Sequence, residues 1–144
     1  MESIILDTNV LSELMRSEPE RAVMEWFAGR TGVTFYVTAI TEAEILLGIA
    51  LLPNGKRRTA LAEAAETMFR MDFAGRSLPF AMVCAAQYAA IVAGRRRAGF
   101  SITTEDAQIA SIALSNIYGL ATRNVGDFLH IDGLVLLNPW GAVG

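Results

Sequence analysis

Three acidic side chains follow the pattern of a site built where strands end and helices begin. Asp7 comes directly after residues 4–6, an apolar run typical of a buried strand. Glu44 and Asp106 each stand three residues after a threonine, at the predicted starts of two helices. If these carboxylates converge, two charges about 4 Å apart repel by roughly 4 kcal/mol, so a cation is needed to neutralise them. Oxygen ligands without histidine or cysteine favour Mg²⁺ or Mn²⁺ over zinc.

Each acid also has a purely structural interpretation as a helix cap. Thr41 with Glu44, and Thr103 with Asp106, have the spacing of a capping box, in which the acid accepts the amide of the cap residue. Asp7 can cap the helix that follows it. Taken singly, capping is the favoured interpretation, since acids are common in first helical turns. Glu44 weakens it, because its neighbours on the same helical face are apolar.

Other catalytic chemistries fit the chain less well. His130 is the only histidine, so a Ser-His-Asp triad would depend on this predicted loop residue. Cys84 lies among small apolar residues and is expected in the core. A phosphatase with an Asp-x-Asp pair would need an acid where Asn9 stands. No phosphate-binding glycine fingerprint is present.

Short apolar runs and apolar residues at helical spacing predict the strands and helices that must position these residues. Strands are predicted at residues 3–6, 34–37, 120–121 and 134–137. Helices are predicted at residues 41–52, 56–73, 81–97 and 103–116, with one more after Pro19. Strands separated by helices indicate an α/β fold with a parallel sheet and helices on both faces. Ligands bind beyond the carboxyl ends of such strands, where Asn124 and Asp127 also fall.

Length and composition indicate one domain spanning residues 1–144. The chain is 53% hydrophobic with a net charge of -3, so any nucleic-acid contact must come from a local patch. Two basic runs, residues 56–58 and 95–97, could follow an RNA backbone or simply lie in solvent. Cys84 is unpaired and no signal peptide is apparent, which favours a reducing, cytoplasmic location. The uncharged run at residues 78–94 is interpreted as a buried helix rather than a membrane span.

Several short motifs occur in the order typical of a PIN domain. They are Leu-Asp-Thr-Asn at residues 6–9, Ala-Glu at 43–44, Glu-Asp-Ala at 105–107 and Ala-Thr-Arg-Asn at 121–124. The chain resembles the VapC toxins of bacterial toxin–antitoxin pairs, most closely the FitB-like branch, from about residue 4 to residue 140. Ala-Gly-Arg at 74–76 and Asn-Pro-Trp at 138–140 are similar to features of that branch.

This resemblance implies a PIN domain with a central, mostly parallel sheet of four to five strands flanked by helices. It implies a metal-dependent ribonuclease, held inactive by a small cognate antitoxin with a DNA-binding domain, and a homodimer without membrane attachment. The first three family acids map onto Asp7, Glu44 and Asp106, and the fourth polar position maps onto Asn124. Because asparagine brings no charge, Asp127 is a candidate for supplying the missing negative charge. Binding of one metal ion and binding of two both remain open alternatives.

The implied roles follow from these positions. Asp7 and Asp106 would hold Mg²⁺ or Mn²⁺, and Glu44 would ligate it or orient the attacking water. Thr8 and Thr122 would support the ligands with their hydroxyls, and Arg123 would meet a substrate phosphate. Two alternatives stay open: a metal-dependent DNase or flap-type nuclease, and a degenerate PIN domain that acts only as a binding partner.

Overall fold

The computed structural model describes residues 2–141. Its centre is a five-stranded sheet in which every neighbouring pair is parallel. The strands, in spatial order, are β3 (Ser77–Leu78), β2 (Thr34–Thr38), β1 (Ser3–Leu6), β4 (Gly119–Ala121) and β5 (Leu136–Leu137). The predicted α/β class and the four to five parallel strands are confirmed.

The central strand β1 separates two hydrophobic cores because its side chains alternate between the two faces of the sheet. Ile4 and Leu6 belong to one core, and Ile5 belongs to the other. All three are essentially inaccessible to solvent. β1 is therefore a strand buried on both faces, as its uninterrupted apolar run predicts.

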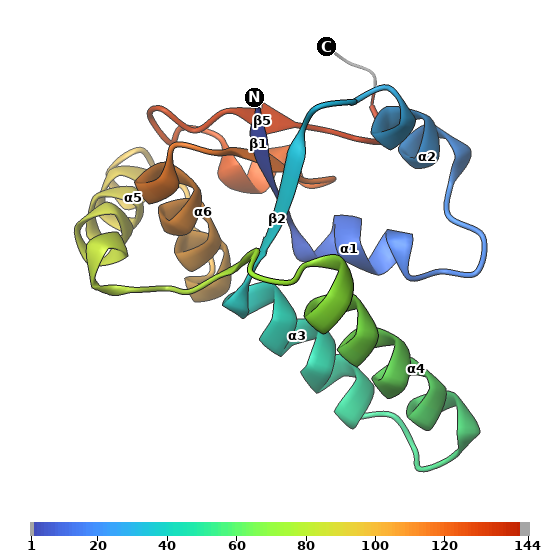
Figure 1. Ribbon diagram of the computed structural model, residues 1–144. Coiled ribbons are helices and arrows are strands. Elements are labelled where there is room, and N and C mark those ends of the chain that lie inside the picture. The colour runs from blue at the N-terminus through green and yellow to red at the C-terminus, as the bar shows by residue number, and fades with distance from the viewer. Residues whose placement is uncertain (1, 142–144) are drawn as a thin grey trace.

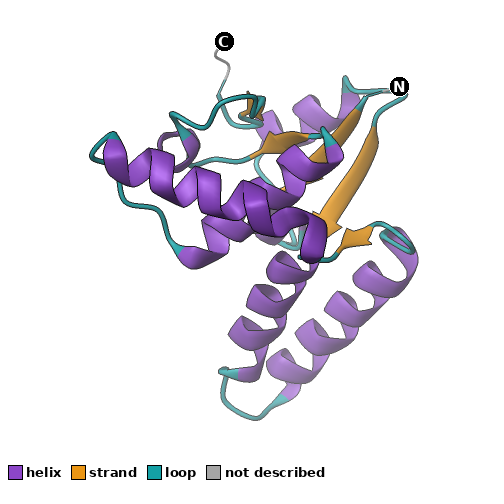
Figure 2. Ribbon diagram, turned by 90° about the vertical axis from the view of Figure 1, so that its left-hand side faces the viewer, coloured by secondary structure: helices purple, strands orange, loops and turns teal. Residues whose placement is uncertain are grey.

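Helices cover both faces of this sheet (Figure 1). The helices are α1 (Thr8–Leu14), α2 (Arg21–Ala28), α3 (Ala39–Ala50), α4 (Lys56–Thr67), α5 (Ala85–Arg97) and α6 (Thr104–Asn116). A π-helical turn η1 (Met68–Asp72) extends α4, a 3₁₀ turn η2 (Met82–Cys84) precedes α5, and a second 3₁₀ turn, η3, spans Val125–Phe128. α5 and α6 pack together, while α3 and α4 form a hairpin that projects from the rest of the molecule (Figures 1 and 2).

Most predicted element boundaries lie close to the observed ones. The helices predicted at residues 56–73 and 81–97 are each divided in two, into α4 with η1 and into η2 with α5. Three further differences remain. α3 begins at Ala39, two residues before its predicted start. The strand predicted at residues 134–137 is reduced to Leu136–Leu137. β3 was not predicted, because two residues are too few to show a period. Within residues 2–141, no helix has both the length and the apolar character needed to cross a membrane.

The second basic run, residues 95–97, is partly structural. Arg95 is 3% exposed, and its guanidinium donates hydrogen bonds to the carbonyl oxygens of Leu129 and Ser101, both at 2.6 Å. It also lies over the ring of Phe100. Arg95 therefore joins the end of α5 to the loops before α6 and after η3, and it cannot contact a nucleic acid.

Candidate active site

Asp7 lies at the carboxyl end of β1, is 5% exposed, and caps α1. One carboxylate oxygen accepts the Thr8 amide at 2.8 Å, and the other accepts the Thr122 hydroxyl at 2.7 Å. The capping interpretation is thus confirmed for Asp7. It does not compete with a site role, because the cap uses one oxygen and the carboxylate still lies at the edge where ligands bind.

The boundary between β1 and β4 is the point at which the winding of the sheet reverses. β2 lies on one side of β1 and β4 on the other, and the Asp7 amide donates to the Ala121 carbonyl at 2.9 Å. Ligand crevices in open α/β sheets form at such switch points. Asp7 and Thr122 are the side chains that follow the two strands there.

Glu44 does not form the predicted capping box. Thr38 is the cap of α3, and its hydroxyl accepts the Thr41 amide at 3.1 Å. Glu44 instead accepts a hydrogen bond from the Thr8 hydroxyl at 2.7 Å, and the Thr8 and Thr41 hydroxyls lie 2.9 Å apart. The correction follows from the earlier start of α3, which moves Glu44 out of the first turn. Glu44 is therefore linked to α1, next to Asp7.

Asp106 lies in the first turn of α6, where the hydroxyl of the cap residue Thr103 accepts its amide at 3.1 Å. The pKa of Asp106 is raised from 3.8 to about 6, first by burial and then by the nearby charges of Asp7, Asp127 and Glu44. The Thr103 hydroxyl opposes this increase. Four acids from four separate segments are therefore electrostatically coupled at one edge of the sheet.

Asp7 lies in a similar electrostatic environment. Its pKa is raised, chiefly by burial, while the hydrogen bonds from Thr122 and Thr8 act to lower it and the charge of Asp127 raises it further. No lysine or arginine is among the main causes of the shifts at Asp7 and Asp106. Burial and the charges of other carboxylates are the main influences, so negative charge accumulates at this site.

An all-oxygen donor set with this excess of negative charge fits a hard divalent cation. The acids are coupled by charge rather than gathered in contact, however. Within residues 2–141, no three aspartate, glutamate, histidine or cysteine side chains form a ready metal-binding group.

Asn124 and Asp127 differ in how they relate to the acids. The Asn124 amide donates to the Thr122 hydroxyl at 3.1 Å, but its side chain makes no hydrogen bond within residues 2–141. Asp127 lies in η3, and its charge contributes to the pKa shifts of both Asp7 and Asp106. The negative charge near Asp7 and Asp106 is thus supplied three residues beyond the position that the family resemblance indicated.

Two further side chains of this region were not predicted as site residues. The side-chain nitrogen of Asn9, Nδ2, lies 3.4 Å from both Asp7 Oδ2 and Thr122 Oγ1. The side-chain oxygen of Asn9 accepts a hydrogen bond from the backbone amide of Arg123 at 3.1 Å. Trp140 lies under the guanidinium of Arg123, 4.9 Å from ring centre to Cζ. Asn9 had a sequence signal, since it directly follows Asp-Thr, whereas nothing local to Trp140 indicates a partner 17 residues earlier.

The family sequence model described as PIN domain matches residues 4–134 of this chain. The chain belongs to the PIN-domain family. Three curated relatives match over nearly their whole length. The plasmid stability protein StbB of Pseudomonas syringae is 45% identical, with 96% of this chain and 99% of the relative covered. The VapC ribonuclease Y4jK of Sinorhizobium fredii is 40% identical (95% and 97%), and the toxin FitB of Neisseria gonorrhoeae is 41% identical (95% and 98%).

A solved structure, that of FitAB bound to an IR36 DNA fragment, agrees with the sequence comparisons. It superposes with a TM-score of 0.88 at 40% identity and covers 98% of both chains. The resemblance to the FitB-like branch of the VapC toxins is therefore confirmed.

Proposed function

We propose that this protein is the ribonuclease toxin of a type II toxin–antitoxin pair, hydrolysing RNA phosphodiesters with a divalent metal ion. The observation that carries the proposal is the set of coupled acids at the β1–β4 switch point, where burial and then the neighbouring carboxylates raise the pKa of Asp106 to about 6. Partly buried carboxylates that repel one another are a poor arrangement for stability but a suitable one for binding a cation. The VapC ribonuclease among the relatives supports the choice of RNA as substrate.

In this proposal Asp7 and Asp106 hold the ion, with Glu44 and Asp127 as further candidates for ligands. The backbone amide of Thr8 and the hydroxyl of Thr122 keep Asp7 oriented, because each donates a hydrogen bond to one of its carboxylate oxygens. A bound Mg²⁺ or Mn²⁺ would lower the pKa of a water molecule and neutralise charge developing on the phosphodiester.

Glu44 is the residue best placed to orient the attacking water. The Thr8 hydroxyl bonds its Oε1, which leaves Oε2 for a water molecule. Hydrolysis adds the water oxygen to phosphorus and breaks one phosphorus–oxygen ester bond. The proton of the water passes to the carboxylate that orients it, and the leaving oxygen gains a proton from solvent.

The proposed partners are a small antitoxin with a DNA-binding domain and a second copy of this chain, both in the cytoplasm. The antitoxin is supported by the relative named a toxin and by the similar FitAB structure bound to DNA. The homodimer is supported by exposed apolar side chains on α3, where Leu46 and Leu47 are 43% and 59% exposed.

The decisive experiment exposes total RNA to the purified, antitoxin-free protein with Mg²⁺, with Mn²⁺ or with a chelator, and maps the new RNA ends. We expect metal-dependent cleavage that Asp7→Asn abolishes and that Asp132→Asn, an exposed acid outside the site, leaves intact. Single-stranded DNA digested in parallel separates a ribonuclease from a DNase. Absence of cleavage together with absence of thermal stabilisation by Mn²⁺ would indicate a degenerate, non-catalytic domain.

Asp127 and Asn124 can be compared in the same assay. Because the charge of Asp127 acts on Asp7 and Asp106, Asp127→Asn should weaken Mn²⁺ binding and cleavage more than Asn124→Ala does. A larger loss in Asn124→Ala would instead assign the fourth position to the asparagine carbonyl. Calorimetric titration with Mn²⁺ measures the binding part of this comparison.

A further inference from the structure

Arg123 is an exposed arginine whose backbone is fixed but whose hydrogen-bond donors are not used. Its amide is held by the Asn9 side chain at 3.1 Å, directly beside the acids. Its guanidinium lies 4.9 Å from the centre of the Trp140 ring. Within residues 2–141, the guanidinium makes no hydrogen bond and no ion pair. An arginine that rests on an aromatic face keeps the N–H groups at its edge available for a planar, two-point contact.

Trp140 is itself well fixed. Its amide donates to the Asn138 side chain at 3.0 Å, and Pro139 between them is buried. The indole nitrogen is shielded from solvent and has no hydrogen-bond partner within residues 2–141. The polar edge of the ring is thus not used for a hydrogen bond within residues 2–141, and the guanidinium of Arg123 lies over its face.

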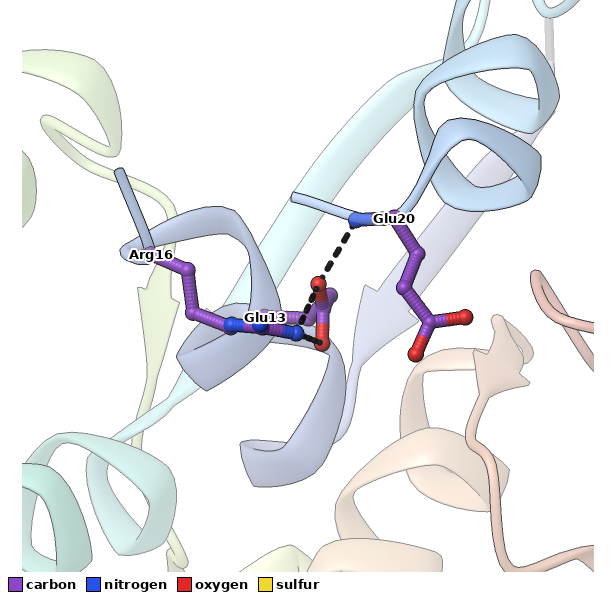
Figure 3. A network of polar contacts seen from close by, with 3 residues as sticks. All are labelled: Glu13, Arg16 and Glu20. Atoms are coloured by element: carbon purple, nitrogen blue, oxygen red, sulfur yellow. Dashed lines mark hydrogen bonds and ion pairs between the residues drawn. The ribbon is translucent and has the colours of Figure 1, made fainter. Parts of the chain in front are cut away.

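A buried carboxylate of α1, Glu13, is near enough to Arg123 for the two charges to interact. It is 6% exposed and accepts the Glu20 amide at 2.8 Å and the Arg16 guanidinium at 3.1 Å (Figure 3). Its pKa is lowered, first by the Glu20 amide, then by Arg16, and also by the charge of Arg123. Glu13 is therefore already hydrogen-bonded to other donors. It attracts Arg123 by charge but leaves the N–H groups of the guanidinium available.

We propose that Arg123, supported by Trp140 and attracted by Glu13, binds a backbone phosphate of the RNA that flanks the phosphate being cleaved. The flanking position follows because the guanidinium rests on Trp140, which comes just after the edge strand β5, rather than on the acids that follow β1 and β4. Arg123 is a substrate-binding residue in this scheme, and Trp140 and Glu13 are positioning residues. The inference rests on the proposed ribonuclease function for its substrate class.

Binding can be measured without cleavage, in chelator, from the fluorescence of Trp140. Trp26→Phe removes the other tryptophan, so the emission of this variant reports on Trp140 alone. We expect an RNA oligonucleotide to change that emission. Arg123→Ala should weaken binding about tenfold, as expected for loss of a charged hydrogen bond. It should also reduce the magnitude of the slope of log K against log salt concentration by about one, the value for one lost phosphate contact. Arg70→Ala, an exposed arginine outside both basic runs, is the matched control.

Steady-state cleavage then separates positioning from chemistry. Trp140→Leu should raise KM for long RNA with kcat nearly unchanged, and Trp140→Phe should restore most of the loss because it keeps an aromatic face. Melting curves of both variants exclude a folding defect. Unchanged KM and salt dependence in Arg123→Ala would overturn the proposal, as would a fall in kcat alone, which would place Arg123 at the cleaved phosphate.

These outcomes are distinguishable from failure of the proposed function. If the wild-type protein cleaves no RNA but its Trp140 emission responds to RNA and Arg123→Ala weakens that response, the binding subsite stands without the nuclease. If the wild type cleaves and Arg123→Ala cleaves with the same KM, the nuclease stands without the subsite.

Discussion

Among single residues, Asp106 links the site most directly to pH. Its pKa of about 6 exceeds the usual 3.8 because it is partly buried and faces other carboxylates. Between these values the folded protein holds more protons than the unfolded chain, so the contribution of Asp106 to stability falls as pH rises from about 4 to 6. The same deprotonation favours cation binding, so Mn²⁺ should raise Tm more at pH 7 than at pH 5.

Asp106→Asn removes the repelling charge and should therefore stabilise the protein at pH 7 when chelator is present. After allowance for solvent screening, the gain is about 1 kcal/mol, or about 3 °C in Tm. Near pH 4 the difference should disappear, because the wild-type carboxyl is then protonated in the folded state. Thermal melts at both pH values test this, with Asp132→Asn as control. A lower Tm for Asp106→Asn at pH 7 would contradict the repulsion.

Thr122 is predicted to act on metal binding through Asp7. Its buried hydroxyl donates to Asp7 Oδ2 and keeps the carboxylate oriented. This hydrogen bond partly opposes the increase in the pKa of Asp7 that burial causes. Thr122→Val should weaken Mn²⁺ binding and cleavage by about 10–100-fold, while Thr122→Ser should retain most of both. Calorimetric Mn²⁺ titration is the measurement. Equal affinities in the valine variant and the wild type would show that the hydroxyl is only structural.

The sequence predicted which acids share an edge but not how each is held. Asp7, Glu44 and Asp106 all fall at the carboxyl edge, because each follows a predicted strand or lies near the start of a predicted helix, and parallel strands end at the same edge. The capping box at Glu44 was wrong because Thr38, rather than Thr41, caps α3. The bond of Asp7 to Thr122 spans 115 residues, and no local pattern encodes a contact at that separation.

At the level of elements, Glu13 joins α1 to α2 (Figure 3). Its carboxylate accepts the amide of Glu20, the residue that precedes the first turn of α2. Because its pKa is lowered from 4.5, its contribution to stability is present above that value and is lost as pH falls through the folded pKa. Glu13→Gln should lower Tm at pH 7, and the difference should vanish in strongly acidic buffer. A difference that persists unchanged there would rule out this ionic contribution.

Arg95 is predicted to hold α5 against the loops before α6 and after η3. Arg95→Ala leaves the carbonyls of Leu129 and Ser101 without these donors and should destabilise the protein by about 3 kcal/mol. Its exposed neighbour gives a matched control, since Arg96→Ala should change stability by less than about 0.5 kcal/mol. Urea unfolding measures both. Similar values for the two variants would show that burial of Arg95 contributes little.

Long helices were predictable from the sequence, and the short strands at the sheet edges were not. α5 and α6 extend over 13 residues each and are followed by glycines that mark their ends, whereas β3 and β5 have two residues each. These edge strands exist because β2 and β4 offer backbone partners to them. Their position is decided by tertiary pairing rather than by their own residues.

Over the whole molecule, the apolar composition corresponds partly to exposed side chains rather than to core. Leu47 on α3 is 59% exposed, and Leu51 at the end of the same helix is 76% exposed. If this face forms the proposed homodimer, Leu47→Glu should convert a dimer to a monomer in sedimentation. Ile117→Glu changes an even more exposed residue outside that face and should leave the dimer intact. A dimeric Leu47→Glu variant would place the interface elsewhere.

The order of the strands has a consequence for how the chain is made. β1 is synthesised first but lies at the centre of the sheet, so Asp7 obtains its Thr122 partner only after 115 more residues. At about 5–20 residues per second, translation of that stretch takes roughly 6–23 s. Asp106 and Asp127 also come from the last third of the chain. Synthesis must therefore proceed past Asp127 before the four acids can come together, so the proposed cation site assembles late in translation.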